Sequence, residues 1–267
     1  MLVSSLIALA AAYGLGVWRL WRAAGVGKGI SLSEVSAFAA GWAALVIALI
    51  GALHELAESL LSAHMIQHEL LMVVAAPLIA LSSPFVAFAW LLRPFYSASG
   101  IRAAGARRRW FIAASRSWAA ITTPATVWLL HALALWLWHL PSLYEAAVRD
   151  EMVHALQHLS FFGSACLFWW GIARGRYGRL GTGAAVIYVF TTALHSGALG
   201  ALLTFSSSLW YPIYGPTSSA WGLTALEDQQ IAGLIMWVPA SVVFTAVGLG
   251  FLALWIRESD RRVRATV

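Results

Sequence analysis

The sequence predicts an all-α, polytopic membrane protein with seven transmembrane helices, an outer N-terminus and a cytoplasmic C-terminus. Of its 267 residues, 61% are hydrophobic and only 10% are charged, a balance that a water-soluble domain does not show. A span of the bilayer core takes about 20 apolar residues, so a chain of this length holds roughly seven spans with short connections. We therefore expect one membrane domain over residues 1–267 and no separate soluble domain.

Long apolar stretches predict the seven helices. They lie near residues 2–21, 35–53, 65–91, 120–140, 152–173, 183–206 and 231–256. The third stretch is too long for one straight span and contains Pro77 and Pro84. We expect either a kinked helix there or a helix that ends near Ser83 before an interfacial turn. The first stretch is followed, not preceded, by basic residues, which favours a retained helix over a cleaved secretory signal.

The basic residues predict the orientation. Sixteen of the seventeen follow the first, third, fifth or seventh helix, and only Arg149 lies on the other side. Because loops rich in Lys and Arg stay in the cytoplasm, residues 92–119 are predicted to be a basic cytoplasmic loop and residues 207–230 an outer loop. The formal charge of +6 is thus interpreted as a topology signal, and no nucleic-acid partner is expected.

Eight histidines are unusual in so apolar a chain, because polar residues at membrane depth are costly unless they are paired or functional. Six are predicted to converge on the outer interface, namely His54, His64, His68, His139, His154 and His158. His131 lies about 12 Å deeper than His139, from eight residues of helix at 1.5 Å rise. His195 lies near the middle of its helix. For these two deeper histidines, the ordinary expectation is an interhelical hydrogen bond.

Two histidine pairs have the spacing of a chelating site. His64 and His68 are separated by four residues, as are His154 and His158. Each pair therefore presents two imidazoles on one helix face, with Cβ atoms about 6 Å apart. Met72 continues the first pair one turn deeper, and a thioether favours Cu(I), whereas imidazole suits copper and zinc. Interhelical hydrogen bonding without any ligand stays open as the alternative.

Other chemistries lack their residues. The single Cys166 excludes an internal disulfide, a CxxC metal site and a thiol redox pair. Neither HxxxH pair has the glutamate of a zinc-protease HExxH motif, and no P-loop or dinucleotide-binding glycine pattern is present. We therefore expect no enzyme activity.

Four segments carry a resemblance to a known family. They are HMIQHELLMVVAAPLIALSSP at residues 64–84, WHLPSLYEAAV at 138–148, VHALQHLSFF at 153–162 and EDQQIAGLIMWVP at 227–239. Together they resemble the CtaG family of multi-spanning bacterial cytochrome c oxidase assembly proteins. The resemblance implies a seven-helix protein of the bacterial plasma membrane that helps to mature a haem-copper oxidase at the stage of copper delivery. The motif residues of the family carry over onto His64, His68, His139, His154, His158 and Asp228.

We accordingly expect a protein embedded in the lipid bilayer, with an outward-facing site that holds Cu(I) at the membrane surface and delivers it to a cytochrome c oxidase subunit. The candidate metal residues are His64, His68, His154, His158, His139, Met72 and Asp228. Histidine and methionine hold copper less tightly than a cysteine pair, which suits a protein that must release its ion. Two alternatives stay open: a haem-binding protein with histidine axial ligands, for which His131 and His195 are better placed, and a ligand-free assembly scaffold.

Overall fold

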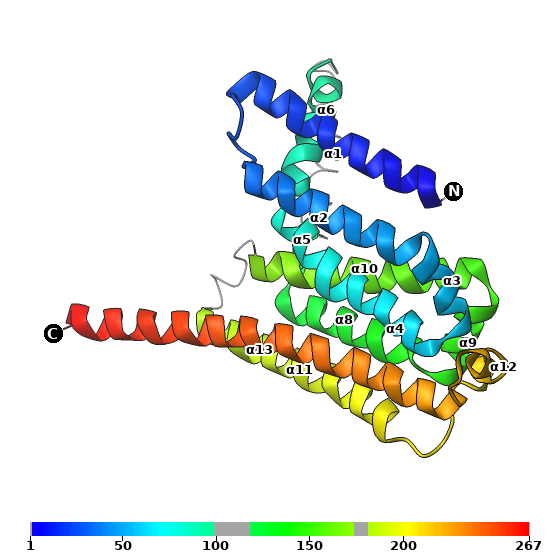
Figure 1. Cartoon of the computed structure of the whole chain (residues 1–267). Coiled ribbons are helices and arrows are strands. Elements are labelled where there is room, and N and C mark those ends of the chain that lie inside the picture. The colour runs from blue at the N-terminus through cyan, green and yellow to red at the C-terminus, as the bar shows by residue number, and fades with distance from the viewer. Residues whose placement is uncertain (1, 99–117, 174–180, 267) are drawn as a thin grey trace.

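The computed structural model describes residues 2–98, 118–173 and 181–266, and every regular element in these ranges is a helix (Figure 1). The predicted all-α class is confirmed. Five of the described helices are long and apolar enough to span a membrane, or six if one bent pair counts as a single span. Seven spans and the orientation of the termini stay predictions. Most of the predicted basic loop 92–119 lies outside the described residues.

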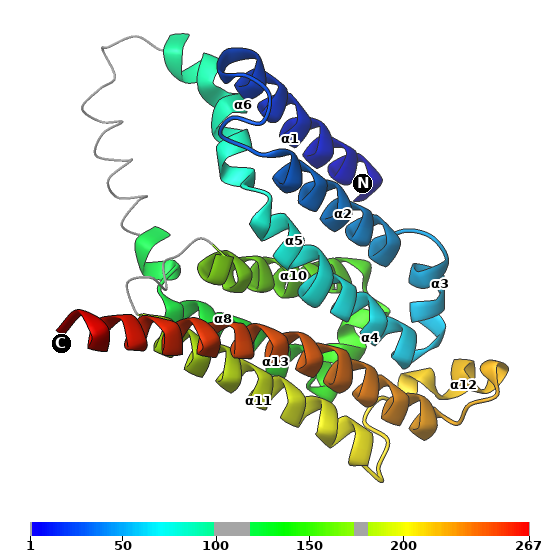
Figure 2. The ribbon, with the colours of Figure 1, turned by 60° about the vertical axis from the view of Figure 1, so that its left-hand side comes forward.

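Three helices form one side of the bundle (Figures 1 and 2). They are α1 (Leu2–Ala24), α2 (Leu32–Leu49) and α6 (Pro84–Ala98). The ring of Tyr13 on α1 stacks on that of Phe38 on α2, with ring centres 3.7 Å apart. This side has an apolar core of its own, separate from the main core between the other helices.

The third apolar stretch is not a single helix. It begins as a continuous rod of α4 (Leu61–Glu69), the π-helical segment η1 (Leu70–Ala75) and α5 (Ala76–Leu81). Ser83 then adopts a φ of 56°, in the left-handed region, and Pro84 begins α6. The expected end of a helix near Ser83 is confirmed, and the alternative of one kinked helix is wrong.

The chain turns between α2 and α4 to lay a short helix across the end of the bundle. Gly51, with a φ of 87°, ends the connection after α2 and precedes α3 (Ala52–Ser59). The helix predicted over 35–53 therefore ends earlier, at Leu49, and His54 belongs to α3 instead of the end of α2.

The middle of the chain forms a bent pair and a long helix. The axes of α8 (Pro124–Trp138) and α9 (Pro141–Arg149) meet at 76°, and His139 lies at the bend. The next helix, α10 (Glu151–Ala173), is 23 residues long but is not among the candidate spans. Its first turns hold the polar residues His154, Gln157 and His158.

The last two long helices, α11 (Thr182–Phe205) and α13 (Ala225–Thr266), pack side by side (Figure 2). Glycines on both helices allow the backbones of α11 and α13 to approach each other closely. A Cβ atom at Gly233 would lie 2.5 Å from Thr204 Oγ1, and one at Gly200 would lie 3.0 Å from the Gly233 carbonyl oxygen. The C-terminal part of α13 extends beyond the rest of the bundle (Figure 1).

The segment between α11 and α13 covers the opposite end of the bundle from that extension (Figure 1). It contains the short helices η4 (Pro212–Tyr214), α12 (Gly215–Ser218) and η5 (Ser219–Trp221). The predicted outer loop 207–230 is therefore partly helical, and its last residues already belong to α13. Tyr214 is buried within this segment.

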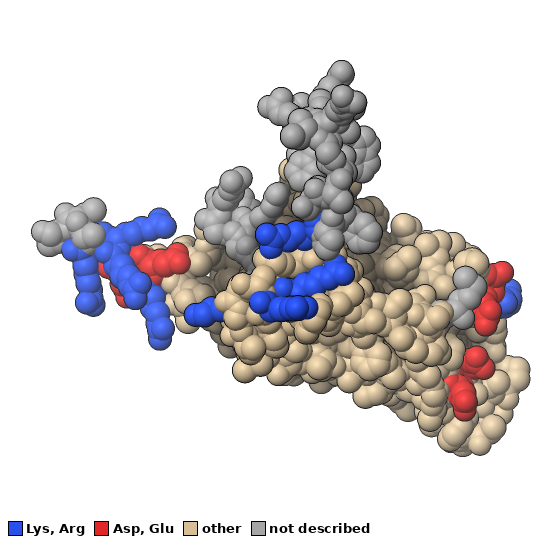
Figure 3. Space-filling view, turned by 90° about the horizontal axis from the view of Figure 1, so that it is seen from above, with Lys and Arg blue, Asp and Glu red and all other residues tan. Residues whose placement is uncertain are grey.

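Charge is distributed unevenly along the bundle. Among the described residues, most Lys and Arg side chains lie toward the end where the C-terminus projects, and acidic side chains gather at the other end (Figure 3). The C-terminal extension also carries the acidic Glu258 and Asp260. The two termini of the chain lie at opposite ends of the bundle (Figure 1).

Candidate metal site

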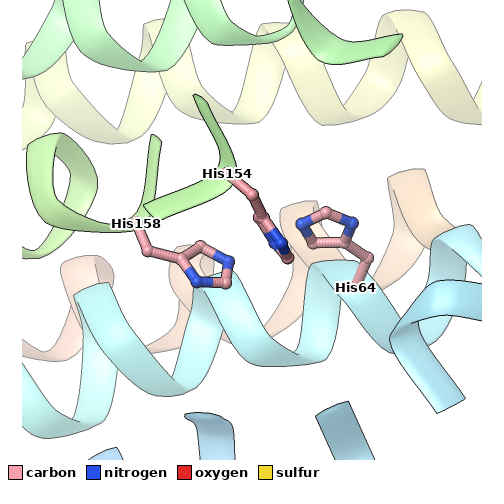
Figure 4. Close-up of side chains that lie close together, drawn as sticks. All are labelled: His64, His154 and His158. Atoms are coloured by element: carbon pink, nitrogen blue, oxygen red, sulfur yellow. The ribbon is translucent and has the colours of Figure 1, made fainter. Parts of the chain in front are cut away.

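Three histidines from two helices converge at the acidic end of the bundle. His64 comes from α4, and His154 and His158 come from α10 (Figure 4). One ring nitrogen of each lies within 4.8 Å of the other two. Ring centres are 5.0 Å apart for His64 and His154, and 4.2 Å apart for His154 and His158. The spacing of four residues places His154 next to His158 on α10. The tertiary fold brings this pair to His64 on α4.

Two further histidines lie beside this group. The ring centre of His68 is 4.5 Å from that of His64 and 5.3 Å from that of His158. The ring of His139, at the bend after α8, is centred 6.2 Å from that of His68. His64, His68 and His139 are only 2% exposed, whereas His154 is half-buried, so His154 is the most accessible of these histidines.

The His64 ring has a tyrosine hydroxyl as its hydrogen-bond partner. The Tyr214 hydroxyl lies 2.9 Å from His64 Nδ1, 3.4 Å from the Ala57 carbonyl oxygen and 3.4 Å from the Tyr144 hydroxyl. Burial raises the pKa of Tyr214, so the phenol keeps its proton. When His64 Nδ1–H donates to this phenol oxygen, the lone pair of His64 lies on Nε2, which has no hydrogen-bond partner among the described residues.

His139 has the same arrangement. Its Nδ1 donates to the Leu135 carbonyl oxygen at 2.7 Å, which places the free lone pair on Nε2. A hydrogen bond from one ring nitrogen to a backbone carbonyl is the usual companion of metal binding through the other.

His54 has the opposite arrangement. Gln67 Nε2 donates to the Ala48 carbonyl oxygen at 2.6 Å, which fixes the orientation of the amide. The same amide nitrogen lies 3.3 Å from His54 Nδ1 and donates to it, so a neutral His54 ring carries its own proton on Nε2. The His54 ring stacks near that of His154, with ring centres 6.1 Å apart. The lone pair on His54 Nδ1 already accepts the hydrogen bond from Gln67.

Several histidine nitrogens are buried without a hydrogen-bond partner among the described residues. They are Nε2 of His64, His68, His139, His154 and His158, and also Nδ1 of His68. A buried polar atom left unpaired costs about 1–3 kcal/mol. A cation bound by these atoms would remove that cost, so their convergence is the main chemical feature of the site.

Asp228 does not face this group. Its two carboxylate oxygens accept hydrogen bonds from the backbone N–H groups of Leu61, at 2.7 Å, and Ser62, at 3.0 Å. These are the first residues of α4, where the helix dipole favours an anion. We therefore assign Asp228 to the capping of the helix that carries His64, and not to the ligand set.

Met72 lies on the π-helical segment η1. The predicted alignment of Met72 with His64 and His68 requires an uninterrupted α-helix. In the π-helical segment, i→i+5 hydrogen bonds put more residues in each turn, so the α-helical spacing no longer applies. The Met72 side chain belongs to the main apolar core, and its carbonyl oxygen accepts from Trp169 Nε1 at 2.9 Å. We therefore leave Met72 out of the proposed ligand set.

The two deeper histidines lie outside the group of three. His131 Nδ1 lies 3.1 Å from Ser164 Oγ on α10, which is the interhelical hydrogen bond expected for it. The ring of His195 packs edge-on against Trp128, with centres 5.3 Å apart, and its two ring nitrogens have no hydrogen-bond partner among the described residues.

Comparison with protein families shows which family the chain belongs to. The model of the cytochrome c oxidase caa3 assembly factor family (Caa3_CtaG) matches residues 11–258. The chain belongs to this family. Comparisons with curated proteins and with solved structures give no match. The matched range includes all helices that carry the histidine group, so the predicted resemblance to the CtaG family is confirmed.

In this member of the caa3 assembly factor family, sequence analysis missed the tyrosines around the histidines. Tyr214 contacts His64, and the Tyr211 hydroxyl donates to the His139 carbonyl oxygen at 2.7 Å. The Tyr144 ring packs against that of Tyr211, with centres 4.3 Å apart. The available signal was the apolar YPIY segment at residues 211–214, within a loop that is otherwise rich in small and polar residues.

Proposed function

We propose that this assembly factor holds a Cu(I) ion between His64, His154 and His158 and passes it to a cytochrome c oxidase subunit at the outer face of a bacterial plasma membrane. The family supports the oxidase as the destination. The observation that carries the proposal is the approach of three imidazole nitrogens, from two helices, to within 4.8 Å of one another.

The spacing suits one ion after small side-chain rotations. Imidazole nitrogens bind a metal at about 2 Å, so three of them around one ion lie roughly 3.5 Å apart. The nitrogens of His64, His154 and His158 are within 4.8 Å before any ion is bound. Binding of one ion therefore requires the three rings to move closer together by about 1 Å, and His154, which is half-buried, is the least confined of them.

The ligand chemistry favours a monovalent ion that can be released. All three ligands are neutral imidazoles, and burying a divalent charge without an anionic ligand costs more than burying a monovalent one. No thiolate is near, because the only cysteine is Cys166 in the apolar half of α10. His154 lies at the open side of the group, so the ion can arrive and leave past this residue.

Elemental analysis of the purified protein tests the proposal. Detergent-solubilised protein is loaded with Cu(I) and desalted, beside a variant with His64, His68, His154 and His158 all changed to Ala. We expect bound copper in the parent and none in the folded variant. His54→Ala is the matched control, since the lone pair of His54 is already used by Gln67, and it should bind copper as the parent does.

Three outcomes separate the alternatives. Absence of copper from the parent, together with a Soret band, would favour haem binding, for which His195 has two unpaired ring nitrogens. Absence of both ligands would favour an assembly scaffold. Oxidase maturation in cells that produce the four-histidine variant at normal protein level would contradict copper delivery even if the purified parent binds copper.

A further inference from the structure

His68 and His139 form a pair that the three-histidine site does not use. Their ring centres are 6.2 Å apart, and both side chains are 2% exposed. His68 comes from α4, whereas His139 comes from the bend between α8 and α9. The pair therefore joins the histidine group to a part of the fold that contributes no ligand to the first site.

The ring nitrogens of this pair have no hydrogen-bond partner among the described residues, apart from His139 Nδ1. Both nitrogens of His68 and Nε2 of His139 are buried and unpaired. The bond from His139 Nδ1 to the Leu135 carbonyl oxygen holds the lone pair of His139 on Nε2, the arrangement of a metal-binding histidine. Three unpaired nitrogens on two buried rings indicate a ligand for this pair as well.

The surroundings restrict the ligand to a small cation of low charge. The Phe161 ring packs against both imidazoles, with centres 4.7 Å from His68 and 5.8 Å from His139. No carboxylate among the described residues hydrogen-bonds to either ring, and the Asp228 carboxylate is occupied by the N–H groups at the start of α4. Without an anionic ligand, a divalent ion would be buried at a high cost.

We propose that His68 and His139 bind a second Cu(I) ion in a two-coordinate site beside the three-histidine site. The proposal rests on the proposed function, since both sites hold the same cargo. Two imidazoles bound in line through Nε2, each about 2 Å from the ion, have ring centres about 6–6.5 Å apart. The observed 6.2 Å matches this spacing. Cu(I) is stable with two ligands in line, whereas zinc takes four.

The two sites are close enough to exchange an ion. The His68 ring is centred 5.3 Å from that of His158. An ion can pass inward when its bond to His158 breaks as its bond to His68 forms, with no change in oxidation state and no proton released. Two cations at this separation repel each other, so the second ion binds more weakly than the first.

Cu(I) titration against a colorimetric chelator of known affinity tests the second site. The parent should bind two equivalents in two steps, and His139→Ala should bind one. An outer-site variant, with His64, His154 and His158 changed to Ala, should keep one equivalent, with two nitrogen ligands by X-ray absorption. Adding His139→Ala to that variant should abolish binding. His54→Ala is the matched control and should behave as the parent.

The outcomes distinguish this inference from the proposed function. A single equivalent in the parent overturns the second site and leaves copper binding intact, whereas no copper in the parent overturns both. Copper in the outer-site variant that His139→Ala does not remove also overturns the second site. Circular dichroism and gel filtration show whether each variant is folded. If the outer-site variant misfolds, the number of copper equivalents bound by the parent and by His139→Ala tests the second site.

Discussion

The partners of Nδ1 differ among the histidines at this end of the bundle. His139 donates from Nδ1 to the Leu135 carbonyl, His64 Nδ1 lies 2.9 Å from the Tyr214 hydroxyl, and Nε2 of both rings has no partner among the described residues. His54 instead accepts at Nδ1 from Gln67. All three are histidines at the same end of the bundle, so residue type and position alone do not predict which of them is a ligand.

Tyr214→Phe removes the hydrogen-bond partner of His64 Nδ1. We expect Cu(I) affinity to fall about 10–100-fold, the usual effect of losing a hydrogen-bond partner of a metal ligand. Competition with a chelator measures it. Tyr13→Phe is the matched control, because the Tyr13 hydroxyl donates to the Ser82 carbonyl oxygen in the other apolar core, and its affinity should not change. Equal affinity in the two variants would mean that Tyr214 does not position His64.

At the scale of the helices, α4 depends on a residue far away in the chain. Its first N–H groups have no side-chain cap of their own, and the Asp228 carboxylate of α13 accepts from two of them. The N-terminus of a buried helix without such a partner would carry unpaired donors. The position of His64 and His68 is thus tied to the start of α13.

Asp228→Asn tests this cap. The amide has one acceptor oxygen and no charge, so one N–H group of α4 loses its partner. We expect a loss of about 1–2 kcal/mol of stability, seen as a lower unfolding temperature in detergent. Asp150→Asn is a matched comparison, since exposed Asp150 caps α10 through the N–H groups of Met152 and Val153, and it should cost less. A larger loss at Asp150 would contradict the role given to Asp228.

The packing of α11 on α13 is tested by Gly233→Ala. The new Cβ atom would lie 2.6 Å from the Thr204 backbone nitrogen, so the helices must separate, at a cost of about 1–3 kcal/mol. Gly250→Ala on the same helix meets nothing within 4 Å and should stabilise it by up to about 1 kcal/mol. Thermal unfolding compares the two. An unchanged unfolding temperature for Gly233→Ala would show that these helices pack less closely.

At the scale of the whole molecule, the histidine group lies where several segments meet. Elements α4 and α10 supply the three-histidine site, the bend after α8 supplies His139, and the segment between α11 and α13 supplies Tyr214. Acidic side chains gather at this same end, apart from those of the C-terminal extension, and most described basic side chains lie toward the other end (Figure 3). This separation is what the positive-inside rule requires if the site faces outward.

Labelling of single cysteines tests the orientation. In a Cys166→Ser background, exposed Glu58 at the acidic end and exposed Arg261 in the C-terminal extension are each changed to Cys. A membrane-impermeant maleimide should label the Glu58→Cys variant in intact cells, and the Arg261→Cys variant only after lysis. The Cys166→Ser parent controls for background labelling. The reverse pattern would place the histidine group in the cytoplasm.

Much of the fold was predictable because its signals are local. Apolar length predicted helices, and Pro84 after Ser83 predicted the break in the third stretch. The π-helical segment at Leu70–Ala75 and the separate helix α3 were not predicted, because neither has a distinctive sequence. The helix predicted over residues 152–173 is present as α10, but α10 is not among the candidate spans.

The sequence by itself determined the helical class, the family and the pairing of His64 with His68 and of His154 with His158, since a spacing of four fixes one helix face. Only the tertiary structure decided that the two pairs meet, that Asp228 caps α4 and that the Tyr214 hydroxyl is the hydrogen-bond partner of His64. These contacts join residues up to 167 positions apart. They depend on how the helices pack, which no local pattern of residues specifies.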